Sequence, residues 1–112
     1  MGSSSNFSTN KGGDGLMLNN KQKKYLRGEA NHLRPLFQIG KEGLSFHFFV
    51  ALKNALEAHE LVKINLLKTA PIQVNEAAIE CATQTNSEIV QIIGKTMILY
   101  RKSKEARIQL PK

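Results

Sequence analysis

The sequence lacks most of the features that define secreted, membrane-spanning and disulfide-bonded proteins. Its 112 residues include a single cysteine, Cys81, which excludes an internal disulfide and any zinc site built from several cysteines. No apolar run approaches the roughly 20 residues that a membrane span requires, and no signal peptide is recognisable. We therefore expect a cytoplasmic protein without membrane contact.

Catalytic and metal-binding motifs are absent as well. The three histidines, His32, His47 and His59, do not have the spacing of metal ligands. The chain contains neither a Gly-x-Ser-x-Gly nucleophile motif nor a Walker-type loop. Cys81 falls on an alanine-rich helical stripe, which favours a small buried hydrophobe over a nucleophile. We expect no enzymatic activity, no cofactor, no metal and no small-molecule substrate.

Composition divides the chain into three parts. Residues 1–16 are rich in Gly, Ser and Asn, and we expect a disordered expression leader there, with Met17 as the natural start. Residues 17–102 are enough for one domain with a modest core. Residues 103–112 form a basic tail that we expect to be loosely held. We expect the protein to be a monomer.

The net charge of +7 is unevenly distributed. Residues 18–41 contain six basic residues and one acidic residue, and residues 95–112 have the same balance. Residues 42–94 contain three basic and six acidic residues. If the fold brings the two basic segments together, they form one basic face on an otherwise acidic domain. Such a face attracts polyanions, so the segregation favours a nucleic-acid partner over a scatter of solvated lysines.

Hydrophobic periodicity predicts helices that alternate with strands. The first helix is weakened by Gly28, which costs about 1 kcal/mol relative to Ala, and it is ended by Pro35. Gly94-Lys95 has the form of a two-residue hairpin turn. The predicted helices are residues 18–33, 45–59 and 74–85, and the predicted strands are 36–39, 60–68, 87–93 and 96–101. This α-β-α-β-α-β-β order predicts an α/β fold with a four-stranded mixed sheet and packed helices.

Gly40-Lys41-Glu42-Gly43 stands between the first predicted strand and the second predicted helix. This setting matches the way in which KH-type loops hold a nucleic-acid backbone. Backbone N–H groups at a helix N-terminus, together with the charge of Lys41, suit a phosphate. The pattern alone is common, and glycines in a strand–helix turn are structurally ordinary. Its weight therefore comes from its setting and from the neighbouring basic segments.

Six segments occur in an order that resembles a known family. They are residues 21–27 (KQKKYLR), 33–35 (LRP), 38–44 (QIGKEGL), 55–63 (ALEAHELVK), 90–94 (VQIIG) and 99–101 (LYR). They resemble the CRM domain, in particular its single-domain bacterial YhbY-type RNA-binding proteins, over about residues 18–102. The resemblance implies a fold similar to the C-terminal domain of translation initiation factor three. It also implies binding to ribosomal RNA or large-subunit precursors during ribosome assembly.

The resemblance places the family's glycine loop on Gly40–Gly43 and its basic first helix on Lys21, Lys23, Lys24 and Arg27. We expect the loop to hold phosphates and further basic side chains to extend that contact, with Tyr100 as a candidate for base stacking. The predicted RNA-binding residues are Gly40, Lys41, Glu42, Gly43, Lys21, Lys23, Lys24, Arg27, Arg34, Lys95, Tyr100 and Arg101. Contacts of this kind carry little sequence information, so recognition would rest on RNA shape.

The second predicted helix departs from the family in its aromatic start, Phe46-His47-Phe48-Phe49. Core packing is the favoured role for Phe48 and Phe49. It is also favoured for Phe46, which could instead stack on a base or contact a protein. The alternative hypothesis is therefore a small protein-interaction module that uses this aromatic start, with incidental RNA contact. A DNA-binding protein ranks lower, because the chain has no helix-turn-helix pattern.

Overall fold

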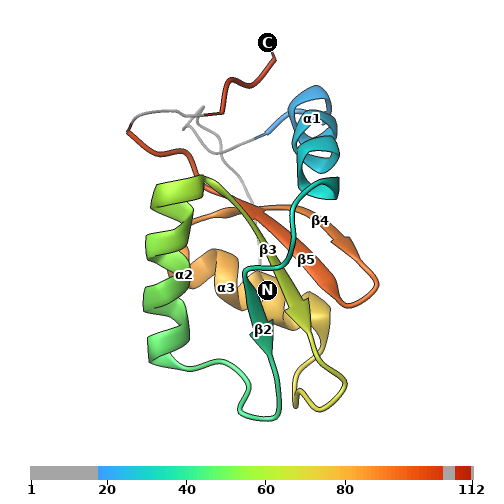
Figure 1. Cartoon of the computed structure of the whole chain (residues 1–112), viewed down its shortest axis with the longest axis vertical. Coiled ribbons are helices and arrows are strands. Elements are labelled where there is room, and N and C mark those ends of the chain that lie inside the picture. Colours follow the sequence, from blue (N-terminus) through green and yellow to red (C-terminus); the bar gives the residue numbers. More distant parts are fainter. Residues whose placement is uncertain (1–17, 105–107, 112) are drawn as a thin grey trace.

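The computed structural model describes residues 18–104 and 108–111, and it places helices on both faces of one sheet (Figure 1). The predicted leader, residues 1–16, lies outside the described residues. The elements are α1 (Asn20–Asn31), β2 (Phe37–Ile39), α2 (Phe46–His59), β3 (Leu61–Leu66), α3 (Val74–Thr85), β4 (Glu88–Ile93) and β5 (Thr96–Tyr100). This order confirms the predicted α/β class. No described helix has the length and hydropathy that crossing a membrane would require.

The four strands form a mixed sheet in the order β2-β3-β5-β4. β2 is parallel to β3, to which α2 connects it, whereas β5 is antiparallel to both β3 and β4. Gly94 has a φ of 58° in the β4–β5 hairpin, as the predicted turn requires. β3 and β4, which α3 connects, run parallel to each other but are not neighbours, because β5 lies between them.

The two faces of the sheet carry separate hydrophobic clusters. α2 and α3 cover one face, where they pack on the side chains of Val62 and Ile64; we call this the large cluster. α1 covers the other face, where Leu26 and Ala30 pack on Leu61; we call this the small cluster. The buried residues of the large cluster are Ile39, Leu52, Leu56, Val62, Ile64, Leu66, Ala77, Ala78, Cys81, Met97 and Leu99, and those of the small cluster are Leu26, Ala30, Leu61, Val90, Ile98 and Tyr100.

α1 is shorter than predicted at both ends. Asn19 caps it, because its side chain accepts a hydrogen bond from Gln22 N at 2.7 Å while the Gln22 side chain accepts one from Asn19 N at 3.2 Å. This capping box starts the helix at Asn20 rather than at residue 18. At the other end Leu33 N donates to Ala30 O at 2.9 Å, a tighter turn than the α-helical one. The helix therefore ends before Leu33 and Arg34.

The C-terminal tail is held more firmly than the sequence indicated, at least over residues 108–111. Ile108 packs against the small cluster, and its N–H donates to Glu60 Oε1 at 2.9 Å. The hydroxyl of Ser103 donates to the other carboxylate oxygen of Glu60. Glu60 is fully buried and has a φ of 67°, an uncommon conformation for a residue other than glycine. A buried carboxylate at the end of α2 therefore anchors the segment that crosses the face carrying α1.

Candidate nucleic-acid interface

The Gly40–Gly43 loop is a tight turn between β2 and α2, at the lower end of the molecule in Figure 1. Gly43 N donates to Gly40 O at 2.9 Å, and Gly43 has a φ of 69°. A Cβ at Gly43 would lie 3.2 Å from Pro71 Cγ. The turn itself therefore favours Gly43, since its φ is one that other residues rarely adopt and a Cβ there would be in tight contact with Pro71. Lys41 and Glu42 are exposed at the tip.

The loop borders a hollow of about 430 Å³ that also reaches α2. Ser45 caps α2, because its hydroxyl accepts a hydrogen bond from Phe48 N at 3.2 Å. The first turn of α2 therefore begins at the hollow, where its dipole favours an anion. Lys41 and Glu42 both line the hollow, so their opposite charges largely offset each other. The lining residues are Gln38, Gly40, Lys41, Glu42, Gly43, Ser45, Phe48, Leu67 and Thr69.

Lys95 lies at the same end of the sheet as the loop. Leu66 N donates to Lys95 O at 2.7 Å, and Leu67 N donates to Ile39 O at 2.8 Å. These two bonds tie the β4–β5 turn and the end of β2 to adjacent residues of β3. The structure thus places Lys95 and the glycine loop at the same end of the sheet, although Lys95 is 52 positions after Gly43 in the sequence.

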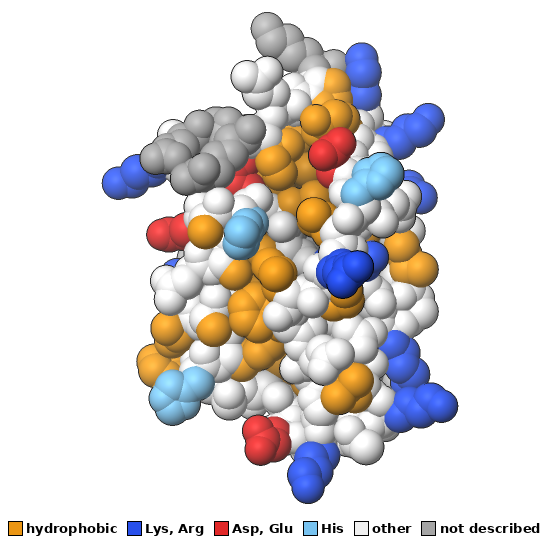
Figure 2. All heavy atoms as spheres, viewed as in Figure 1, with side chains coloured by type: hydrophobic (Ala, Val, Ile, Leu, Met, Phe, Trp, Pro, Cys, Tyr) orange, Lys and Arg blue, Asp and Glu red, His pale blue; other side chains and the backbone are white. Residues whose placement is uncertain are grey.

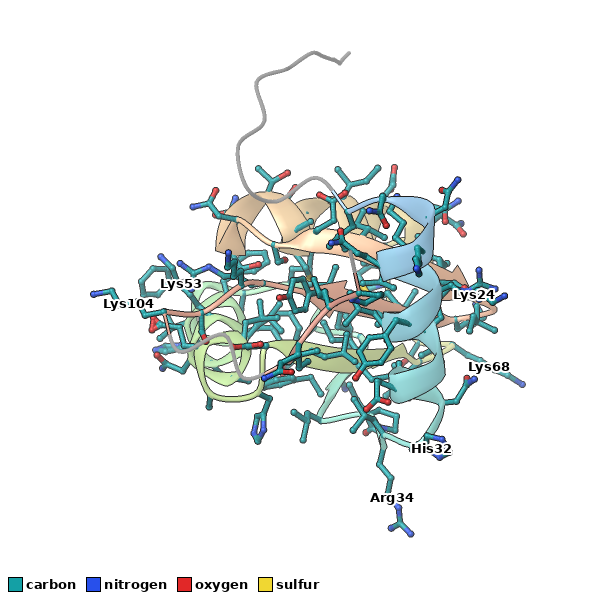
Figure 3. The ribbon with its side chains drawn as sticks, turned by 90° about the horizontal axis from the view of Figure 1, so that it is seen from above. Lys24, His32, Arg34, Lys53, Lys68 and Lys104 are labelled. Carbon is teal, nitrogen blue, oxygen red and sulfur yellow. The ribbon has the colours of Figure 1, made fainter. Side chains whose placement is uncertain are left out.

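The basic residues of α1 border a groove between α1 and β4, with a volume of about 320 Å³. Lys24 and Arg27 line it from α1, and Gln91 and Ile93 line it from β4. Lys24 projects to the same side of the molecule as Lys68 in Figure 3, and Figure 2 shows Lys and Arg side chains along the corresponding margin. We call this side, with Lys24, Arg27 and Lys68, the basic margin. Lys21 is also exposed. Lys23 is half-buried and lies near Glu88, whose carboxyl has a pKa raised by burial, an effect that the charge of Lys23 opposes in part.

The two basic segments do not form one face, contrary to the expectation from charge. β5 separates Lys95 from Arg101, which places them about 20 Å apart along an extended strand. Arg101 Nη1 lies 3.8 Å from Glu57 Oε1 at the end of α2. Lys104 projects with Lys53 on the side opposite Lys24 (Figure 3). Of the predicted C-terminal cations, Lys95 lies near the loop and Arg101 does not. Arg34 follows α1 and projects away from the fold by itself (Figure 3).

Two aromatic predictions are wrong. Tyr100 is 2% exposed and its ring belongs to the small cluster, so it is not available to stack on a base. Burial, together with the charge of Glu60, raises the pKa of its hydroxyl. Phe46, which was expected in the core, is 77% exposed. Phe48 and Phe49 do pack against the large cluster, as predicted.

Several residues on or beside the basic margin were not predicted as RNA-binding residues from the sequence. Lys68 falls on the β3–α3 connection, within the acidic middle of the chain, and so did not stand out. Gln91 and Ile93 reach the groove because the register of β4 against β5 shifts between Ile89 and Gln91. Such an irregularity turns side chains to a new face. Strand periodicity alone gives no signal for it.

The described residues contain no group of three or more His, Cys, Asp or Glu side chains arranged to hold a metal ion. Cys81 is fully buried in the large cluster. Burial, assisted by the charge of Glu80, raises the pKa of the Cys81 thiol to about 12. The thiol therefore stays protonated at neutral pH, and a nucleophilic role is excluded.

The fold and its exposed cations define a small α/β protein with a basic margin suited to a polyanion. Residues 18–101 match the model of the CRS1/YhbY (CRM) domain, and the chain belongs to this family. It is 42% identical over 96 residues to the probable RNA-binding protein YqeI of Bacillus subtilis, with 85% of this chain and 100% of that protein covered.

Two further relatives are also named or described as RNA-binding proteins. An RNA-binding protein of Haemophilus influenzae is 38% identical over 99 residues, which cover 85% of this chain and 96% of that protein. The solution structure of the Staphylococcus aureus protein SAV1595, described as a candidate RNA-binding protein, superposes with a TM-score of 0.72 at 41% identity. That superposition covers 85% of this chain and 100% of the other.

Proposed function

We propose that this protein is a non-catalytic RNA-binding protein that associates with ribosomal RNA in precursors of the large ribosomal subunit. The observation that carries the proposal is the position of the exposed cations. Lys24 and Lys68 project to one side of the molecule (Figure 3), and Lys95 lies at the end of the sheet that carries the loop and Lys41. Relatives that are named RNA-binding proteins support the choice of RNA over other polyanions.

In this proposal the phosphate backbone supplies most of the affinity. Lys41 holds phosphates at the start of α2, where the helix dipole also favours them, whereas the Gly43 N–H is already bonded to Gly40 O within the turn. Lys24 and Arg27 extend the contact along α1. Since backbone contacts position an RNA without reading its bases, recognition would depend on RNA shape.

The first test is a titration of large-subunit ribosomal RNA fragments at several salt concentrations. Neutralisation of about four to six phosphates gives a slope of log affinity against log salt of roughly −3 to −5. A slope near zero would remove the electrostatic model. The Lys41→Glu variant should bind more weakly while its thermal unfolding stays unchanged, because Lys41 is exposed.

A matched control separates the contribution of the loop from that of net charge. Lys53 is exposed on α2 and projects to the side opposite Lys24 (Figure 3). The Lys53→Glu variant has the same change in net charge as Lys41→Glu, and it should lose much less affinity. Equal losses for both variants would mean that the loop is only a turn and that binding depends on overall charge.

A second candidate function is supported by the exposed aromatic residue. Phe46 is 77% exposed and Val50, one turn later on α2, is 42% exposed. This small apolar surface suits a protein partner, with RNA contact incidental. Migration with ribosomal particles distinguishes the two functions. Release by moderate salt or by ribonuclease supports RNA binding, whereas retention through both treatments supports a protein interface at Phe46.

A further inference from the structure

The hollows on the described surface differ in charge. The hollow between the ends of α1 and α2 has an apolar lining, part of the orange area near the middle of Figure 2, and its charged residues are Glu29, Arg34 and Lys63. The hollow at the loop contains Lys41 and Glu42. The groove between α1 and β4 differs from both, because Lys24 and Arg27 line it and no acidic side chain does. Of the three, it is the one in which no carboxylate opposes a polyanion.

Gly28 lines this groove from the middle of α1. Nothing in the described part of the protein explains a glycine there. Its φ is not positive, unlike those of Gly43 and Gly94, so the backbone does not require it. A Cβ at this position would meet no atom within 4 Å among the described residues, so packing does not require it either. Glycine weakens a helix, and the remaining structural use of glycine is the close approach of a ligand to the backbone.

The opposite wall of the groove is suited to the same ligand. The register shift between Ile89 and Gln91 places Gln91 and Ile93 in the groove opposite α1. The Gln91 amide can donate to a phosphate or ribose oxygen. Ile93, which is 46% exposed, can contact the ribose. Asn31 adds a second amide from the last turn of α1.

We propose that the groove between α1 and β4 holds a segment of the RNA sugar–phosphate backbone, and that this segment passes directly over Gly28. The inference rests on the proposed RNA-binding function and specifies where the RNA lies. Lys24 and Arg27, three residues apart on one helix face, neutralise the phosphates from one side. Because Gly28 has no side chain, the RNA backbone can lie against α1, between these two cations and β4.

The test is a pair of variants, Gly28→Ala and Gly28→Leu, measured for thermal unfolding and for binding to a fluorescein-labelled RNA hairpin with a single-stranded arm. Both residues favour the helix over glycine, so the unfolding midpoint should rise. The added side chain should displace the RNA, and we expect about tenfold weaker binding for Gly28→Leu and a smaller loss for Gly28→Ala. The salt slope should stay unchanged, because neither variant removes a charge.

Two controls make the result specific. The Ala58→Leu variant adds a leucine at an exposed position of α2 and should bind like the unmodified protein. The Arg27→Gln variant should weaken binding and reduce the salt slope by about one. A steric loss at Gly28 together with an electrostatic loss at Arg27 is the expected result.

The inference and the proposed function fail in different ways. If the unmodified protein does not bind the RNA with a salt-dependent affinity, the proposed function fails. If it binds and Gly28→Leu binds equally well, the groove is empty in the complex and the inference alone is overturned. If Gly28→Leu unfolds at a lower temperature, then Gly28→Ala, which adds only the Cβ, decides between these outcomes.

Discussion

The two faces of the sheet are built for different purposes. α2 and α3 cover one face completely enough to bury eleven residues in the large cluster, whereas α1 and residues 108–110 bury six in the small cluster on the other face. The groove and the basic residues of α1 accompany the small cluster. The sheet therefore separates a face covered by two helices from a face on which an open groove lies between α1 and β4.

Under the proposed function, this difference explains how a domain of this size can use one helix for binding. Burial of apolar surface supplies the stability, and most of that burial lies on the face of the sheet that α2 and α3 cover, away from α1. A helix on the other face can then carry exposed cations and a destabilising glycine without unfolding the domain. The comparison predicts that substitutions on the two faces have different consequences for stability and for RNA binding.

The largest effect should come from Leu56→Ala in the large cluster. Leu56 is fully buried, and removal of such a side chain costs about 3–4 kcal/mol of unfolding free energy through lost burial and a residual cavity. Chemical denaturation measures this loss. The folded protein should bind RNA within about twofold of the unmodified affinity, because the change is remote from the groove. A large loss of affinity in the folded protein would show that the two faces are not independent.

The same substitution on the other face, Leu26→Ala, should have a smaller effect on stability. Leu26 is also fully buried, but its cluster includes the partly buried Ile108 and Leu110 of the tail. These residues can move into the space, so we expect a loss of about 2–3 kcal/mol. RNA affinity should also fall several-fold, because Leu26 packs α1, which carries Lys24 and Arg27, against the sheet. Unchanged affinity in a binding titration would mean that the position of α1 does not matter for RNA.

The fold could be predicted from the sequence where local signals decide the structure. Ser45 has the chemistry of an N-cap, Gly94 that of a hairpin turn, and the apolar spacing of residues 74–85 matches α3 residue for residue. The shorter α1 was also readable, since Asn19 and Gln22 have the spacing of a capping box. Each of these features depends on a few neighbouring residues.

The site was less predictable, because it depends on which faces are covered. Alternation places Ile98 and Tyr100 on one side of β5, but only the packing of α1 shows that this side is buried. Helical periodicity did contain the answer for Phe46, which shares a face with Lys53 and Glu57 at spacings of seven and eleven residues. The irregularity in β4 depends on strand register, which no local pattern determines. The separation of Lys95 from Arg101, by contrast, follows from the extended strand between them, which the sequence did predict.

The smallest change in stability should come from Glu88→Gln, at the start of β4 and near Lys23 of α1. Burial raises the pKa of the Glu88 carboxyl above its ordinary value of 4.5, and the charge of Lys23 lowers it in part. A raised pKa means that the folded state favours the protonated form. The stability that this proton gives is therefore complete below pH 4.5 and is lost as the pH rises through the pKa of the folded state.

Glu88→Gln should remove that pH dependence. We expect the variant to be more stable than the unmodified protein at pH 7, by less than about 1 kcal/mol because solvent screens a half-exposed carboxyl, and equally stable at pH 4. Loss of the carboxylate beside Lys23 should also strengthen RNA binding slightly. Glu76→Gln on α3 has the same change in net charge on the opposite face and should leave RNA binding nearly unchanged. Thermal unfolding at both pH values checks this prediction. If the unfolding midpoints of Glu88→Gln and the unmodified protein differ by the same amount at pH 4 and at pH 7, the prediction is contradicted, since Glu88 would then be as solvated in the folded protein as in the unfolded chain.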